Sequence, residues 1–214
     1  MIKGRRDGSG GEVRCTFYAD LLVRESDTDT PSPEDALLVR AGRTRPACNA
    51  RPTAGVRLKT AGFGLVGRAG PFLLFQESSS HDSVPFVVVD TRTGRTVIEE
   101  ISDVGIDEPG AMRIIKAEPG AITLAFRRGF NATCSIIANP AKCWKSIAND
   151  RVAAMPRAVA RFTAPVPACA RSYRKASAPA DNPSVITYPA QVSWTASQGK
   201  RVTGSGPVEC WPLP

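Results

Sequence analysis

The chain has 214 residues, of which 42% are hydrophobic and 22% charged, and this ordinary globular balance excludes an intrinsically disordered protein. The formal net charge is +8, from 28 Lys and Arg against 20 Asp and Glu, which favours an acidic protein or an anionic envelope polymer as partner. Most of the 21 arginines are scattered, as on a solvated surface. No nucleic-acid ligand is expected, because the sequence has no binding-module signature and no basic-aromatic groove pattern.

The first residues leave two compartments open. Segment 1–12 is rich in Gly, Arg and Ser and is expected to be a flexible leader or tag remnant before a single β-rich domain at 13–214. It lacks the apolar stretch of a signal peptide, so the protein is either cytosolic or a mature form whose signal peptide has been replaced. No run approaches the roughly 18 apolar residues that cross a bilayer, so no membrane span is expected.

Short apolar runs, broken by Gly or Pro about every ten residues, follow this segment and are typical of consecutive antiparallel strands. The expected strands cover 13–17, 36–40, 62–67, 71–76, 85–90, 95–101, 112–117, 121–126 and 133–138. Asp90 and Gly94 fit a hairpin turn between two of them. A second hairpin is expected at 127–133, with Gly129 or Asn131 at its turn.

Two short helices are expected in the C-terminal half. Asn139 is placed as N-cap and Pro140 at the first helical position, and the apolar stripe of this helix comprises Cys143, Trp144, Ile147 and Ala148. A second helix is expected over 168–176. Strand-like sequence returns at 184–194 and 200–211, where Pro189 predicts an edge strand or a bend. The expected fold class is α+β: mainly an antiparallel β meander or sandwich-like sheet with these two helices, crosslinked by disulfides.

The cysteines decide between the compartments. The six are Cys15, Cys48, Cys134, Cys143, Cys169 and Cys210. Zinc sites use closely spaced Cys or His pairs, and thioredoxin-like sites use C-x-x-C; neither spacing occurs, so we expect no metal and no cofactor. Structural disulfides remain, and the simplest of the fifteen possible pairings joins nearest neighbours. Their even number favours a periplasmic or secreted protein.

Two stretches are candidates for function. Arg127, Arg128 and Phe130 would meet at the tip of the second hairpin, and such basic-aromatic groups are favoured at binding surfaces; the alternative is a solvated turn with Phe130 tucked inward. The loop 77–83 contains Ser, His81 and Asp82, but a catalytic triad needs groups that converge from different parts of a fold. We interpret it as a polar loop, in which His81→Ala should have little effect.

The leading hypothesis is therefore an extracytoplasmic, disulfide-stabilised binding protein rather than an enzyme. It would engage another macromolecule, for instance as an inhibitor or immunity-type partner of a secreted effector. The alternative is an extracytoplasmic hydrolase that acts on an envelope polymer through paired carboxylates. The sequence does not identify the catalytic residues of such an enzyme. A pocket with convergent carboxylates would distinguish the two.

Overall fold

The computed structural model describes residues 2–4, 12–27, 36–40, 48, 55–60, 62–77, 83–149, 155–160, 163–204 and 206–213. The chain forms two compact units: Met1–Ser78 with Phe86–Glu99 (unit 1), and Ser79–Pro85 with Glu100–Pro214 (unit 2). The region 13–214, expected as one domain, is thus divided between both units. The predicted fold class of mainly antiparallel sheets, with short helices in the C-terminal half, is confirmed.

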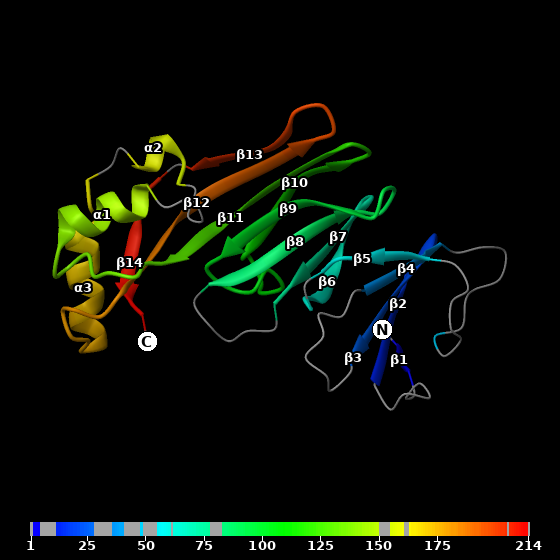
Figure 1. Ribbon diagram of the computed structural model, residues 1–214, viewed down its shortest axis with the longest axis horizontal. Helices are drawn as coiled ribbons and strands as arrows, with labels where there is room; N and C mark the ends of the chain where they lie inside the picture. The colour runs from blue at the N-terminus through cyan, green and yellow to red at the C-terminus, as the bar shows by residue number, and fades with distance from the viewer. Residues whose placement is uncertain are drawn as a thin grey trace. The chain divides into compact units, whose positions relative to one another are not determined.

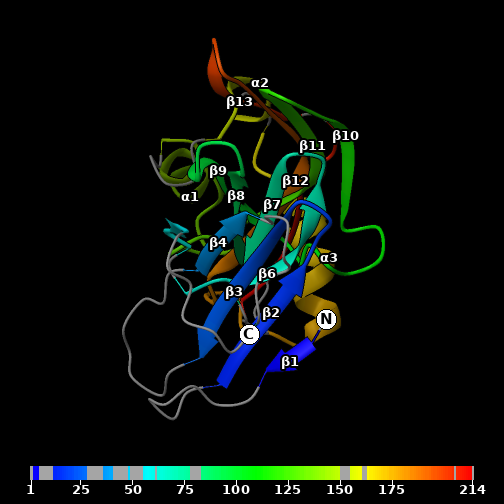
Figure 2. The same ribbon diagram turned by 90° about the vertical axis from the view of Figure 1, so that its right-hand side faces the viewer.

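Unit 1 contains two groups of strands. The first is a five-stranded antiparallel sheet in chain order (Figure 2), formed by β1 (Ile2–Gly4), β2 (Glu12–Phe17), β3 (Leu21–Asp27), β4 (Ala36–Arg40) and β5 (Val56–Leu58). The second comprises β6 (Gly64–Ala69), β7 (Phe72–Gln76), β8 (Val84–Asp90) and β9 (Arg95–Ser102), hydrogen-bonded in that order. The sequence patterns missed β3 and β5, and β1 lies within the segment that was expected to be a flexible leader.

The two groups of strands share one hydrophobic core, so unit 1 is a β-sandwich. β3, β4, β7 and β8 each contribute two residues at alternate positions, because successive side chains of a strand point to opposite faces, and β5 and β6 contribute one residue each. The buried members of this core are Leu21, Val23, Ala36, Leu38, Leu58, Leu65, Leu73, Phe75, Val87 and Val89. Burying a side chain of the Leu, Val or Phe type contributes about 1.5–3 kcal/mol, so the alternating pattern fixes the register of these strands.

Unit 2 is built on a long two-stranded ribbon. β11 (Ala121–Asn131) pairs along its whole length with β12 (Ser184–Thr195), and β10 (Met112–Glu118) pairs with the first half of β11. The outer edge of β12 pairs with β14 (Glu209–Pro212) and then with β13 (Gly199–Gly204). Pro189 lies between these two partners, so its missing N–H costs no ladder hydrogen bond; it marks a change of partner within a continuous strand.

Three helices gather at one end of this ribbon (Figure 1): α1 (Pro140–Ala148), α2 (Arg157–Ala160) and α3 (Val166–Ala176). The predicted start of α1 is confirmed. Asn139 is the N-cap residue, although its side chain makes no capping hydrogen bond, and Pro140 is the first residue of the helix. α1 and α3 bury Cys143, Trp144, Ile147, Cys169 and Tyr173 against one face of β12. α2 was not expected from the sequence.

The nearest-neighbour disulfides are confirmed. Cys15 pairs with Cys48, Cys134 with Cys143 and Cys169 with Cys210, at Cα–Cα distances of 5.9, 5.7 and 4.7 Å. Three disulfides in a chain of this size are typical of an oxidising, non-cytoplasmic compartment. Within the part of the chain that the structure describes, no helix combines the length and apolarity needed to cross a membrane.

Two predicted elements are wrong. Residues 133–138 form turns rather than a strand, because the Ser135 hydroxyl accepts hydrogen bonds from the amides of Ile137 (3.1 Å) and Ala138 (3.2 Å) and so bends the chain toward α1. The hairpin at 127–133 does not exist, because β11 continues through it to Asn131. Gly129 is explained by close packing instead, since a Cβ there would lie 2.9 Å from the Cα of Asp103.

Candidate functional site

Arg128, one of the predicted binding residues, is buried in an ion-pair network. Its Nε donates to Glu100 Oε2 (2.7 Å), and its Nη1 donates to the hydroxyl of Tyr188 (3.0 Å), the residue opposite it on β12. Lys200 on β13 donates to the other oxygen of Glu100 at 3.0 Å. The Glu100 side chain is 0% exposed and that of Arg128 7%. Burial opposes the charge of Arg128, but Tyr188 and Glu100 outweigh it and raise the pKa of the guanidinium.

Arg127, the neighbouring residue on β11, lies in a second, half-buried network. It donates to Asp103 Oδ2 (3.0 Å), to the Thr187 hydroxyl (2.7 Å) and to Glu209 Oε2 (2.8 Å). Asp103 follows β9, Thr187 lies on β12 and Glu209 on β14, so the guanidinium connects several strands of unit 2. Burial is the main influence on Asp103 and raises the pKa of its carboxyl despite the arginine.

The three predicted partner-binding residues therefore do not form a hairpin tip. Arg127 and Arg128 are neutralised by carboxylates of their own unit, and Phe130 is half-buried and packs against the core that α1 and α3 share with β12. Buried ion pairs of this kind must be satisfied for the fold to be stable. This geometry favours a structural role for the arginines of β11.

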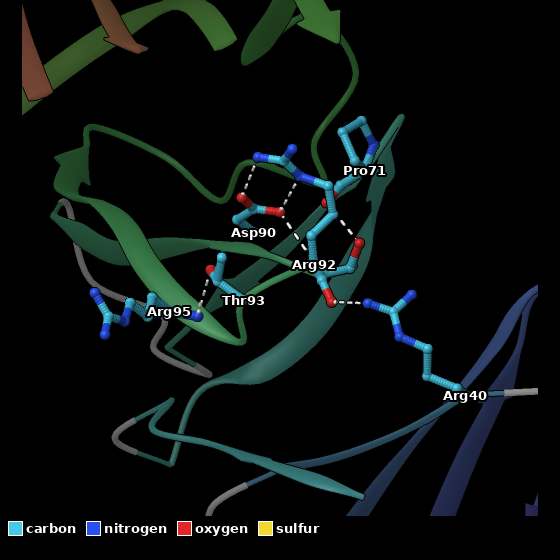
Figure 3. A network of polar contacts seen from close by, with 7 residues as sticks. Arg40, Pro71, Asp90, Arg92, Thr93 and Arg95 are labelled. Carbon is cyan, nitrogen blue, oxygen red and sulfur yellow. Dashed lines mark hydrogen bonds and ion pairs between the residues drawn. The ribbon is translucent and has the colours of Figure 1, made fainter. Parts of the chain in front are cut away.

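In unit 1, a comparable network closes the β8–β9 turn (Figure 3). The Asp90 carboxylate accepts from the amide of Arg92 (2.9 Å) and from its guanidinium (2.9 Å), and the amide of Gly94 donates to the Asp90 carbonyl at 2.8 Å. Gly94 has a φ of +70°, as the predicted hairpin requires. Arg40, on β4 of the other sheet, donates to the Thr91 carbonyl at 2.8 Å. This network joins the two layers of the sandwich.

The positive charges on α1 and α3, unlike those of β11, are exposed. Between positions 140 and 176 the sequence has eight Lys and Arg and a single Asp, a net of +7 out of the chain's +8. Five of these cations, which we call the basic helical region, are exposed on α1 and α3: Lys142, Lys145, Arg171, Arg174 and Lys175. None of the five makes an ion pair with any residue in the described ranges.

Helix stability does not explain this arrangement. Cations are favourable near a helix C-terminus, where Lys145, Arg174 and Lys175 lie, but acidic residues are favoured in the first turn. None of the three described helices has an acidic residue there. Moreover, Lys142 and Lys145, Arg171 and Arg174, and Arg171 and Lys175 are three or four positions apart, a spacing at which like charges repel. The repulsion within these pairs offsets the favourable C-terminal positions, so this charge gives the helices no net stabilisation that would explain it.

A groove of about 560 Å³ lies beside α1. Its described lining is mostly apolar and comes from α1, the end of α2 and the segment that leads into α3; it comprises Pro140, Ala141, Trp144, Lys145, Ala148, Asn149, Ala160, Thr163, Ala164 and Val166. A smaller pocket of about 340 Å³ is lined by Thr163, Pro165 and residues 206–208. Neither described lining includes an Asp or Glu.

The described linings of these two pockets do not contain the facing carboxylates that a glycosidase-type hydrolase would need. Asp103 and Glu209 converge, but on the guanidinium of Arg127 rather than around either of these pockets. In the same part of the chain, no group of three His, Cys, Asp or Glu side chains could hold a metal ion. His81 and the rest of 78–82 lie outside the described residues, so the interpretation of that loop stays a prediction.

No protein family, curated protein or solved structure matches this chain. The candidate site therefore rests on the geometry of unit 2 alone. It consists of the basic helical region and the groove beside α1. Sequence reasoning missed it because it looked for adjacent pairs of arginines; a count of opposite charges over 140–176 would have found it.

Proposed function

We propose that this protein is an extracytoplasmic, disulfide-stabilised binding protein, periplasmic or secreted, that engages an acidic protein through the basic helical region. The observation that carries the proposal is the uncompensated charge of that region: five exposed cations on two helices without a carboxylate partner among the described residues. Such a surface attracts an acidic partner over a Debye length of about 8–10 Å and raises the rate of encounter.

Both basic helices are held by crosslinks, which supports binding with little loss of conformational entropy. Cys143 of α1 is joined to Cys134, and Cys169 of α3 is joined to Cys210 of β14. The same two helices share a core with β12. A surface that is already ordered keeps more of its interaction energy as affinity. A rigid basic surface of this kind suits an inhibitor or immunity-type partner that covers an acidic site on a secreted effector.

The experiment is a capture from the envelope and culture fractions of the native host, followed by a wash with increasing salt. Two variants that lose the same charge are compared. The helical variant carries Arg171→Gln, Arg174→Gln and Lys175→Gln; the control variant carries Lys59→Gln, Arg95→Gln and Arg113→Gln, three exposed cations elsewhere. Wild type and control variant should retain one acidic protein at low salt and release it at high salt.

The helical variant should retain much less of that protein and release it at lower salt, because only Lys142 and Lys145 of the basic helical region remain. Equal capture by both variants would show that the partner binds elsewhere and would refute the proposal. If an anionic polysaccharide or lipid is captured in place of a protein, and only the helical variant fails to capture it, the binding surface stays as proposed but the class of partner changes.

A further inference from the structure

The groove beside α1 has the features of a docking site for a partner segment. Two adjoining sides of α1 have different surroundings: Cys143 and Ile147 enter the core, whereas Ala141, Trp144 and Ala148 line the groove, and Trp144 also belongs to that core. These three are spaced at i, i+3 and i+7, which places them on one side of a helix. Because two of them are alanines, the wall beside the Trp144 indole is hollow rather than filled.

The opposite wall is also made of small apolar side chains. Ala160 ends α2, Ala164 precedes α3 and Val166 begins it. Polar groups occur in the lining only at a few described positions, among them Asn149 and Thr163. The groove is therefore apolar along its walls and polar at a few points, as is usual for sites that receive apolar side chains in a fixed orientation.

The charge at the groove selects the occupant. Lys145 belongs to its lining, and Lys142 lies three residues earlier on the exposed side of α1. Neither makes an ion pair with a residue that the structure describes, and the described lining has no carboxylate. An occupant with carboxylates beside its apolar side chains would complement both the walls and these cations.

We propose that the groove binds an acidic amphipathic α-helix of the partner protein, with its apolar side chains against Trp144 and Ala148 and its carboxylates on Lys142 and Lys145. This inference rests on the proposed function and names the segment that the site recognises. The stretch from Pro140 to Asn149 spans about 15 Å, at about 1.5 Å per residue. That length accommodates the i, i+4 and i+7 side chains of a docked helix. An anionic polysaccharide would have no apolar side chains for these walls.

The test fills the groove without changing its charge. Ala141 is exposed and lines the groove, so Ala141→Phe should occupy it; Ala176→Phe, at an exposed alanine of α3 outside the groove, is the matched control. Three labelled probes of equal length are used: a peptide with Leu and Glu on opposite sides of a helix, its scrambled isomer, and polyglutamate. Circular dichroism checks that each variant is folded, and Ala148→Phe replaces Ala141→Phe if that variant does not fold.

The amphipathic peptide should bind wild type about tenfold more tightly than the scrambled isomer or polyglutamate, and Ala141→Phe should remove this advantage, as expected when an apolar anchor is excluded. Ala176→Phe should bind as wild type does. Equal binding of all three probes, unaffected by Ala141→Phe, would overturn the groove assignment but leave the proposed function in place if the helical variant still loses binding. Tighter binding to anionic lipid vesicles, with the same sensitivity to Ala141→Phe, would assign the groove to a membrane instead. If no acidic probe binds, both proposals fail.

Discussion

Arg128 on β11 and Arg174 on α3 belong to the same unit and carry the same guanidinium, but their surroundings are opposite. Arg128 is buried and hydrogen-bonded to Glu100 and Tyr188, whereas Arg174 is exposed and has no ion-pair partner in the described ranges. A buried charge must be compensated within the fold. An exposed one is solvated and costs little, so it stays available to another molecule. In this protein, cations paired with a carboxylate of the same unit are therefore structural, whereas exposed cations without such a partner among the described residues are candidates for binding.

The largest expected effect comes from breaking the buried network. Arg128→Met removes one of the two cations paired with Glu100, whose side chain is 0% exposed, and leaves only Lys200. It should lower the free energy of unfolding by about 3 kcal/mol, the lower end of the range for a broken buried ion pair, because the buried carboxylate keeps only its more exposed partner. Urea unfolding measures the change. The double variant Arg128→Met with Glu100→Leu should recover part of the loss. A single variant as stable as wild type would show that the network is not structural.

A smaller loss of stability is expected when Arg127, the residue before Arg128, is replaced. Arg127→Met removes three hydrogen bonds, but the Arg127 side chain is 35% exposed and Glu209 is 53% exposed, so water replaces part of the interaction. The expected loss is about 1–2 kcal/mol. The same urea titration should rank the two variants in this order. The reverse order would contradict the difference in burial between the two arginines.

Asp103 gives this second network a pH dependence. Burial raises the pKa of its carboxyl, so the folded state holds the proton more tightly than the unfolded chain, in which Asp titrates near about 3.9. The stabilising contribution is therefore complete below that value and is lost as the pH rises through the higher folded pKa. Relative to Asp103→Asn, wild type should lose stability as the pH is raised above about 4. A constant difference, or one of opposite sign, would contradict the shift.

The sequence predicted the parts of the fold that depend on local pattern. The turn at Asp90 and Gly94, the start of α1 at Pro140 and the pairing of neighbouring cysteines are all confirmed. Each depends on residues that are close in the chain or on spacing alone.

The failures involve distant partners. Residues 127–133 contain Gly and Asn, which favour a turn locally, but pairing with β12 some sixty positions later extends β11 to Asn131. The same partners explain why Arg127 and Arg128 were mistaken for surface residues: their carboxylates come from β9, its following turn and β14. Tertiary context overrides local propensity in such cases.

The smallest effect on stability is expected in the basic helical region. Arg171, Arg174 and Lys175 repel one another at i, i+3 and i+4, by about 0.2–0.5 kcal/mol for each pair. Arg174 and Lys175 also lie in the last turn of α3, where cations are favourable, and this opposes the repulsion. The helical variant, in which Gln replaces all three, should therefore stay within about 1 kcal/mol of wild type in the urea titration. A loss of more than about 1 kcal/mol would show that these cations support the fold, which would contradict their assignment as binding cations.

The most direct test of that distinction is the rate at which labelled polyglutamate associates with wild type, the helical variant and the control variant as ionic strength is raised. Exposed, uncompensated cations steer an acidic chain, and salt screens this attraction. The rate for wild type and for the control variant should fall steeply with salt. The helical variant, which keeps only Lys142 and Lys145 of the basic helical region, should associate more slowly at low salt and with a weaker dependence on salt. Equal rates and equal salt dependence for the two variants would contradict the account, because they would show that the cations of α3 contribute no more to association than the same number of charges elsewhere.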